Sequence, residues 1–314
     1  MPISDMKSFI KKSLLFALFF ILYFISLNSV FLVIIERTDW DFVKRLQSLK
    51  FNNPDYEVLV LGTSLAEYGV DTELMSRKDL KSFNLSMVGS SIQTNYIQLN
   101  EYLSKYPIKP KYVLLFVNSY LEQFDQAGIQ PVIEFTMKNQ VYNLKDIPIS
   151  KFNWAGMELL KKLIRKEYRQ TFVSFGQKKC MYFEPDYSKF KNLRLDLNKY
   201  KSAFWIGEIA KICQSNRIQF VVVDIPGVKE TQNTSEIGPY VLNYGNESSA
   251  ILYNFNNQAF CTFIDSERDW AGRSHFNKYG AEKFTKIFFD IVFSNQDSRI
   301  YTEFISLERP NAIH

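Results

Sequence analysis

The 314-residue sequence contains only two histidines and three cysteines. Its cysteines, Cys180, Cys213 and Cys261, lie far apart and form no C-x-x-C pair, so neither a zinc motif nor a disulfide framework is indicated, and at most one pair could form. We expect no metal ion and no cofactor. The net charge of +5 is mild, and the basic residues are spread along the chain rather than gathered in one arm. We therefore expect no nucleic-acid partner.

Charge is absent from one long segment, residues 14–35, which reads LLFALFFILYFISLNSVFLVII. Such a run can cross a hydrocarbon core of about 30 Å. A cleaved signal peptide is the alternative, but the run is too long for its apolar region and no A-x-A site ends it. Three lysines precede the run: Lys7, Lys11 and Lys12. Because lysine favours the cytoplasmic side, we expect a cytoplasmic N-terminus (1–12), a single transmembrane anchor (13–36) and an extracytoplasmic remainder.

Beyond the anchor, short apolar runs alternate with helical patterns. Three runs rich in Val and Leu are typical of buried parallel strands: residues 57–62, 111–117 and 218–226. Two segments have apolar residues at helical spacing: 91–106 and 278–293. We expect the last strand at residues 261–264. This order predicts an α/β fold, a three-layer α/β/α sandwich on a parallel sheet, with the active crevice at the carboxyl ends of the strands.

We expect this α/β domain to span residues 50–295 and a C-terminal tail to span 296–314. Residues from 126 to about 195 interrupt the alternation, because they mix aromatic and basic residues with no clear strand. They are interpreted as an insertion with one or two helices. The insertion is either a solvated flap or a cover over the crevice that meets an acidic or sugar-rich substrate.

A candidate nucleophile follows the first expected strand, where VLVLGTS ends at Ser64. A serine hydroxyl needs a base to take its proton, and the base is most often a histidine. His314 is the last residue, which leaves His275 as the candidate base. Ser64 and His275 would arrive at the same rim of the sheet from opposite ends of the chain. The alternative for His275 is a role in helix capping or packing.

Four short blocks resemble, in order and spacing, those of the SGNH or GDSL-type hydrolase superfamily: Gly62-Thr63-Ser64, Gly89 in NLSMVGSS, Asn118 in LLFVNSY and His275 in SHFNKYGAEKF. The resemblance covers about residues 56 to 293 apart from the insertion, and it implies an SGNH hydrolase-like fold. It also implies that Ser64 is the nucleophile and His275 the base. The backbone N–H groups of Ser64 and Gly89, with the Asn118 amide, would form the oxyanion hole. The family usually has Asp at the position of Thr63, a change that membrane-anchored relatives also show.

A more serious departure concerns the third member of the family's triad. Its D-x-x-H motif has an aspartate three residues before the histidine, where this chain has Gly272. Asp269 or Asp265 could supply the carboxylate from a shifted loop, or a backbone carbonyl could orient the ring of His275. We favour a Ser-His pair over a triad with Asp269, because the bulky residues between Asp269 and His275 would have to fold back sharply.

The combination of one anchor with such a domain resembles a subgroup that modifies cell-surface polymers, the alginate O-acetylation proteins and the teichoic acid D-alanyl transfer protein. The resemblance implies an O-acyltransferase or acyl esterase acting on an extracytoplasmic polysaccharide. Its implied partners are that polysaccharide, an acyl donor and a membrane-bound O-acyltransferase. Two alternatives remain: a catalytically weak or inactive SGNH-like scaffold that recruits the acyltransferase, and an anchored carbohydrate-binding module that uses the aromatic insertion.

Overall fold

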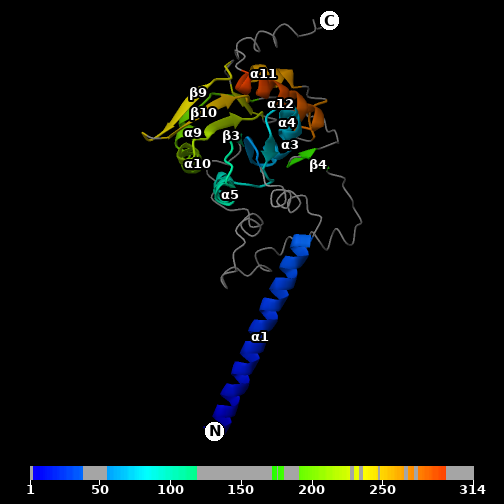
Figure 1. Cartoon of the computed structure of the whole chain (residues 1–314), viewed down its shortest axis with the longest axis vertical. Coiled ribbons are helices and arrows are strands. Elements are labelled where there is room, and N and C mark those ends of the chain that lie inside the picture. Colours follow the sequence, from blue (N-terminus) through cyan, green and yellow to red (C-terminus); the bar gives the residue numbers. More distant parts are fainter. Residues whose placement is uncertain are drawn as a thin grey trace. The chain divides into compact units, whose positions relative to one another are not determined.

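The computed structural model describes residues 3–37, 55–118, 172–174, 176–179, 191–226, 230–232, 236–246, 248–264, 268–271 and 275–294. Contacts divide the chain into two units, residues 1–44 with 139–169 and residues 45–138 with 170–314. Among the described residues, the first unit holds one helix and the second holds the sheet and the remaining elements (Figure 1). Each unit is described by itself. The predicted boundaries 1–12, 13–36, 50–295 and 296–314 stay predictions.

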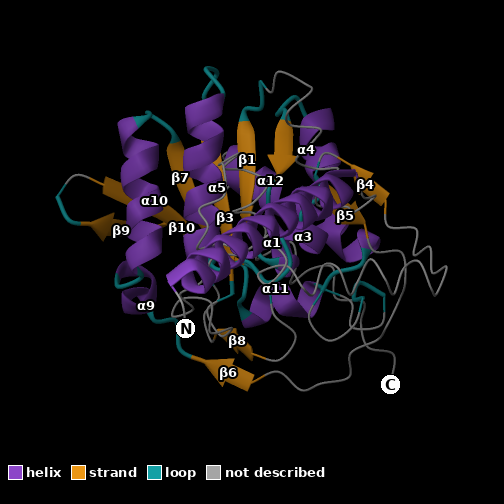
Figure 2. Ribbon diagram, turned by 90° about the horizontal axis from the view of Figure 1, so that it is seen from below, coloured by secondary structure: helices purple, strands orange, loops and turns teal. Residues whose placement is uncertain are grey.

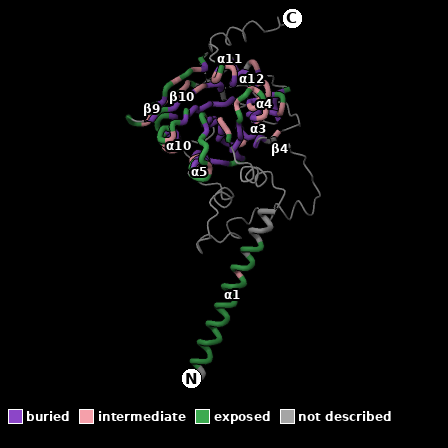
Figure 3. Tube along the Cα trace, in the orientation of Figure 1, coloured by how far each residue is buried: buried purple, intermediate pink, exposed green. Residues whose placement is uncertain are grey.

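Helix α1 (Ile3–Arg37) contains the apolar segment that the sequence predicts as an anchor. Residues Met6–Leu27 form a stretch long and apolar enough to cross a membrane, and all of them except the half-buried Phe24 are exposed (Figure 3). At 1.5 Å per residue, 22 residues reach about 33 Å, which matches a hydrocarbon core. A signal sequence passes the same test, so anchoring and orientation stay predictions.

A six-stranded sheet forms the centre of the second unit. Its strands, in spatial order, are β2 (Ser82–Asn84), β1 (Val58–Gly62), β3 (Tyr112–Val117), β7 (Gln219–Asp224), β10 (Ser248–Asn254) and β9 (Tyr240–Tyr244). The first five are parallel and β9 is antiparallel to β10. The antiparallel direction of β9 follows from its short connection to β10, because only antiparallel strands can be joined so closely. The predicted α/β class is confirmed, with a mixed rather than wholly parallel sheet.

Helices cover both faces of this sheet. One face carries α3 (Ser64–Gly69), α4 (Thr72–Arg77) and α12 (Lys278–Phe293), and the other carries α5 (Ile92–Lys105) and α10 (Phe204–Ser215) (Figures 1 and 2). On the first face, Phe116 of β3 contacts Phe284 and Phe288 of α12, with ring centroids 6.1 and 5.3 Å apart. On the second, α5 and α10 contact each other through Tyr96 and Trp205. This is the predicted three-layer arrangement.

The expected strand at residues 261–264 is wrong, because most of this segment belongs to helix α11 (Gln258–Phe263). The side chain of Asn257 caps the helix by accepting a hydrogen bond from the backbone N–H of Phe260 at 2.8 Å. A four-residue apolar run fits a buried strand and a buried helix equally well, and the cap decides between them. The last parallel strand is therefore β10.

The predicted insertion, residues 126 to about 195, lies largely outside the described residues, as do its expected helices and the tail at 296–314. Its described parts are short strands, which the sequence did not indicate: β4 (Phe172–Ser174), β5 (Gln177–Lys179) and β6 (Lys191–Leu193). Strands β4 and β5 form an antiparallel pair, while β6 pairs with β8 (Glu230–Gln232). Helix α9 (Leu197–Lys201) follows β6. Lys179 of β5 forms an ion pair with Glu73 of α4 at 2.7 Å, which ties the β4–β5 pair to the helix that follows α3.

Candidate active site

Ser64 lies at a tight turn between β1 and α3. Strand β1 ends at Gly62, and Ser64 is the first residue of α3, with Thr63 as its N-cap. Gly62 has a φ of +150°, and a Cβ atom on it would lie 2.8 Å from the Phe116 carbonyl oxygen. Only glycine fits so close an approach. The turn therefore leaves Ser64 half-buried at the carboxyl end of β1.

His275 reaches this serine from the opposite end of the chain. Its Nε2 atom lies 2.8 Å from Ser64 Oγ, across 211 residues of sequence. Burial lowers the pKa of the imidazole from its ordinary value of 6.5, which favours the neutral ring. In the tautomer with an unprotonated Nε2, the Ser64 hydroxyl donates this hydrogen bond. The two residues therefore have the geometry of a nucleophile and its general base.

Tyr68 contacts the imidazole from the same helix as the serine. Its ring centroid lies 5.1 Å from that of His275, with the rings at 69° to one another. Ser64 and Tyr68 are four residues apart on α3, so they share one face of the helix. We did not identify Tyr68 from the sequence, although the spacing from Ser64 was a usable signal.

The segment that carries His275 folds back on itself. The backbone N–H of Ala271 donates to the His275 carbonyl at 2.7 Å, and that of Asn277 donates to the Asp269 carbonyl at 2.9 Å. Between these bonds Trp270 and Phe276 form an antiparallel bridge. The sharp reversal that we expected to disfavour Asp269 is therefore present. It is stabilised by the buried Trp270 and Phe276 rings, whose centroids are 4.6 Å apart.

Asp269 is buried, and its Oδ2 atom forms an ion pair with Lys283 Nζ of α12 at 2.5 Å. Gly280 lets the first turn of α12 pack against the backbone of Asp269, because any Cβ there would overlap the carbonyl oxygen. This Asp269 oxygen is thus directed to a lysine. A triad role for Asp269 stays a prediction. Asp265 and Gly272 lie outside the described residues.

The predicted oxyanion donors lie after β2 and β3. Gly89 is exposed in a turn after β2, with a φ of +72°. Asn118 directly follows β3, is buried, and donates from Nδ2 to the Ile225 carbonyl at 3.0 Å. The oxyanion roles of Ser64, Gly89 and Asn118 stay predictions.

The two cysteines in the described part of the chain lie in surroundings that disfavour the reactive thiolate. Cys213 and Cys261 are free and buried, and burial raises the pKa of each thiol far above its ordinary range. Cys180 lies outside the described residues. Within the described ranges, His, Cys, Asp and Glu side chains form no cluster of three that could hold a metal ion.

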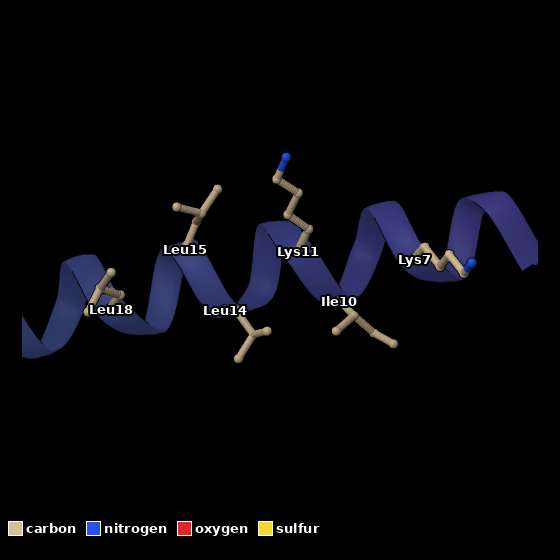
Figure 4. A pocket seen from close by; sticks show the side chains of 6 residues that line it. All are labelled: Lys7, Ile10, Lys11, Leu14, Leu15 and Leu18. Carbon is tan, nitrogen blue, oxygen red and sulfur yellow. The ribbon is translucent and has the colours of Figure 1, made fainter.

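Two surface hollows border neither Ser64 nor His275. One runs along α1 and is lined by Lys7, Ile10, Lys11, Leu14, Leu15 and Leu18 (Figure 4). All of these residues come from a single helix, so this hollow is part of its surface and not a catalytic crevice. The other lies between α5 and α10, where its lining includes Asn100 and Glu208.

No family model and no curated protein matches the sequence. Among solved structures, the chain is similar in fold to a crystal structure from Bacteroides fragilis whose description proposes an acylhydrolase. That likeness has a TM-score of 0.36 and 9% sequence identity, and it covers 82% of this chain and 99% of the other. At this distance it carries no argument about activity, substrate or partners.

Proposed function

We propose that this chain is a serine-dependent O-acyltransferase or acyl esterase of the SGNH type. In this proposal α1 anchors it in a membrane, and its α/β domain acts outside the cytoplasm on a cell-surface polysaccharide. The observation that carries the proposal is the 2.8 Å contact between Ser64 Oγ and His275 Nε2 at the carboxyl end of β1. Burial lowers the pKa of His275 and so favours the neutral imidazole, which can accept a proton.

The chemistry follows from this pair. As Ser64 Oγ attacks an acyl carbonyl carbon, His275 Nε2 takes the hydroxyl proton, and the carbonyl oxygen becomes an oxyanion. The N–H groups of Ser64 and Gly89, with the Asn118 amide, are the proposed donors to that oxygen. Collapse of the tetrahedral intermediate expels the alcohol group of the donor, which takes the proton from His275 and leaves an acyl ester on Ser64.

The second half of the reaction decides between the two activities. His275 takes a proton from an incoming hydroxyl, whose oxygen attacks the acyl-Ser64 carbonyl carbon. As the acyl–Oγ bond breaks, His275 returns that proton to Ser64 Oγ and the free serine is restored. Water as the attacking molecule gives an esterase, and a sugar hydroxyl gives an O-acyltransferase. The proposed polysaccharide acceptor and membrane-bound O-acyltransferase partner are supported by the family resemblance and by the apolar helix α1.

One observation favours the scaffold alternative. Asp269 Oδ2 is paired with Lys283, and the position of the family's aspartate is Gly272. Loss of the carboxylate that orients a catalytic histidine can lower kcat by about 10⁴-fold. The scaffold alternative therefore predicts a serine with little reactivity.

A fluorophosphonate probe applied to the full chain in detergent tests the proposal. We expect the native protein to be labelled, and Ser64→Ala and His275→Ala to lose labelling by on the order of 10³-fold or more. Ser104→Ala is the matched control. Ser104 is an exposed serine on α5, and its replacement should leave labelling unchanged. Equal labelling of Ser64→Ala would show that the reactive serine lies elsewhere. Absence of labelling in the native protein would favour the scaffold.

A further inference from the structure

A buried carboxyl group lies one helical turn after the candidate nucleophile. Glu67 of α3 is only 2% exposed. A carboxyl group buried to this degree is costly unless it is hydrogen-bonded. Its Oε2 atom accepts a hydrogen bond from the backbone N–H of Val88 at 2.7 Å, at the short end of the usual range. This bond links α3 to a loop 21 residues further along the chain.

The loop that receives this bond is a turn of four residues, Met87 to Ser90. The backbone N–H of Ser90 donates to the Met87 carbonyl at 3.1 Å, and Gly89, at the third position, has a φ of +72°. A type II turn requires this conformation at its third residue. The N–H of Met87 donates to the Gly62 carbonyl at 3.3 Å. The turn is therefore attached to β1, which ends just before Ser64, and through Glu67 to α3, which begins at Ser64.

We infer that Glu67 is a positioning residue, which holds the turn 87–90 beside Ser64 and so sets the direction of the Gly89 N–H. The part of this inference that concerns catalysis rests on the proposed function, in which the Gly89 N–H stabilises the oxyanion. Such donors act by being in place before the reaction starts. The side chain of Val88 and residue Gly89 are exposed, so burial does not hold them. The Glu67 bond supplies the restraint instead.

Three variants separate the hydrogen bond from the bulk of the side chain. Glu67→Gln keeps a carbonyl oxygen that can accept from Val88, whereas Glu67→Met keeps similar volume with only the weakly accepting thioether sulfur. Glu208→Met is the matched control. It removes a glutamate from α10 that forms a surface pair with Lys211 at 2.6 Å.

The first measurement is backbone hydrogen exchange of the peptide covering residues 85–91 in the full-length protein. We expect Glu67→Met to speed exchange of the Val88 amide by roughly 10-fold, the loss of one ordinary hydrogen bond. In Glu67→Gln and Glu208→Met, the exchange rate of this amide should stay within about 2-fold of the native rate. This readout does not depend on any catalytic activity.

The second measurement is steady-state hydrolysis of p-nitrophenyl acetate. We expect Glu67→Met to lower kcat by roughly 10- to 100-fold with KM nearly unchanged, because a displaced oxyanion donor affects the transition state more than the bound ester. Its apparent acid-side pKa should match that of the native protein, since His275 and Ser64 are untouched. Glu67→Gln should restore kcat to within about 3-fold.

Unchanged exchange in Glu67→Met overturns the inference, and so does a Gln variant that behaves like the Met variant. Faster exchange with an unchanged kcat overturns the link between the turn and catalysis. If the native protein hydrolyses no ester and its Ser64 is not labelled, the proposed function fails, and exchange alone then decides whether Glu67 holds the turn.

Discussion

At the scale of the residue, the proposed mechanism makes the reactivity of Ser64 depend on the protonation state of His275. Burial lowers the imidazole pKa below 6.5, and the ring of Tyr68 covers part of it. Below its pKa the ring is protonated at both nitrogens and cannot accept the serine proton. If His275 is the base, the direction of this pKa shift should extend reactivity of Ser64 to more acidic pH.

We predict that the rate of fluorophosphonate labelling is constant at neutral pH and falls on the acid side with an apparent pKa below 6.5. The measurement is the labelling rate of the full chain across this pH range, with Ser64→Ala as the background. An apparent pKa above 6.5 would contradict the shift, because it would mean that a neighbouring negative charge stabilises the imidazolium.

The role of Asp269 can be tested by Asp269→Asn, which replaces one carboxylate oxygen with an amide nitrogen. Because its Oδ2 atom is paired with Lys283, we predict that Asp269→Asn lowers stability more than reactivity. Weakening such a charged hydrogen bond costs about 1–3 kcal/mol. The melting temperature should therefore fall, as it should in Lys283→Met, while the labelling rate stays within about 3-fold of native.

Two further outcomes bear on the same residue. If the site functions as a Ser-His pair, Gly272→Asp should raise the labelling rate, because it restores the carboxylate of the family motif. A loss of labelling by about 100-fold or more in Asp269→Asn, with an unchanged melting temperature, would instead place Asp269 in a triad with His275.

At the scale of the element, Asn277 joins helix α12 to the segment that carries His275. Its Oδ1 atom caps α12 by accepting from the N–H groups of Tyr279 and Gly280 at 2.9 and 3.1 Å. Its Nδ2 donates to the Arg268 carbonyl at 2.6 Å. One side chain thus fixes both the start of the helix and the return of the chain, two residues after the candidate base.

We predict that Asn277→Asp keeps the cap but loses the Nδ2 donor, so that the helix is retained while labelling of Ser64 falls on the order of 10-fold. Circular dichroism and the labelling rate measure the two effects. Asn257→Asp is the control, because Asn257 caps α11 in the same way and donates from Nδ2 to Asn254. Equal loss of labelling in both variants would contradict a specific role for Asn277.

At the scale of the whole molecule, the expected topology depends on charges beside the apolar run. Lysines precede it and acidic residues follow, which favours a cytoplasmic N-terminus. We predict that protease added outside intact cells, or outside spheroplasts where an outer membrane exists, digests residues 40–314. A cytoplasmic protein in the same cells is the control for leakage. Protection of residues 40–314 would reverse the orientation.

Periodicity in the sequence predicted the elements that are buried on one or two faces. Strands β1, β3 and β7 and helices α5 and α12 all lie where apolar patterns placed them. The pattern was ambiguous for short elements, because a brief apolar run fits a helix as well as a strand. The segment of α11 was therefore wrongly predicted as a strand. The strand conformation of β9, β4 and β5 depends more on the strands with which they pair than on their own sequences.

For the candidate site, the sequence by itself determined that a serine follows the first strand and that a single internal histidine precedes the last helix. Only the tertiary structure brought Ser64 and His275 to 2.8 Å, because the conformation of the folded-back segment sets where the ring points. It also directed Asp269 to Lys283 and Glu67 to Val88. Local patterns report which face of an element is buried, whereas contacts between distant residues depend on how whole elements pack.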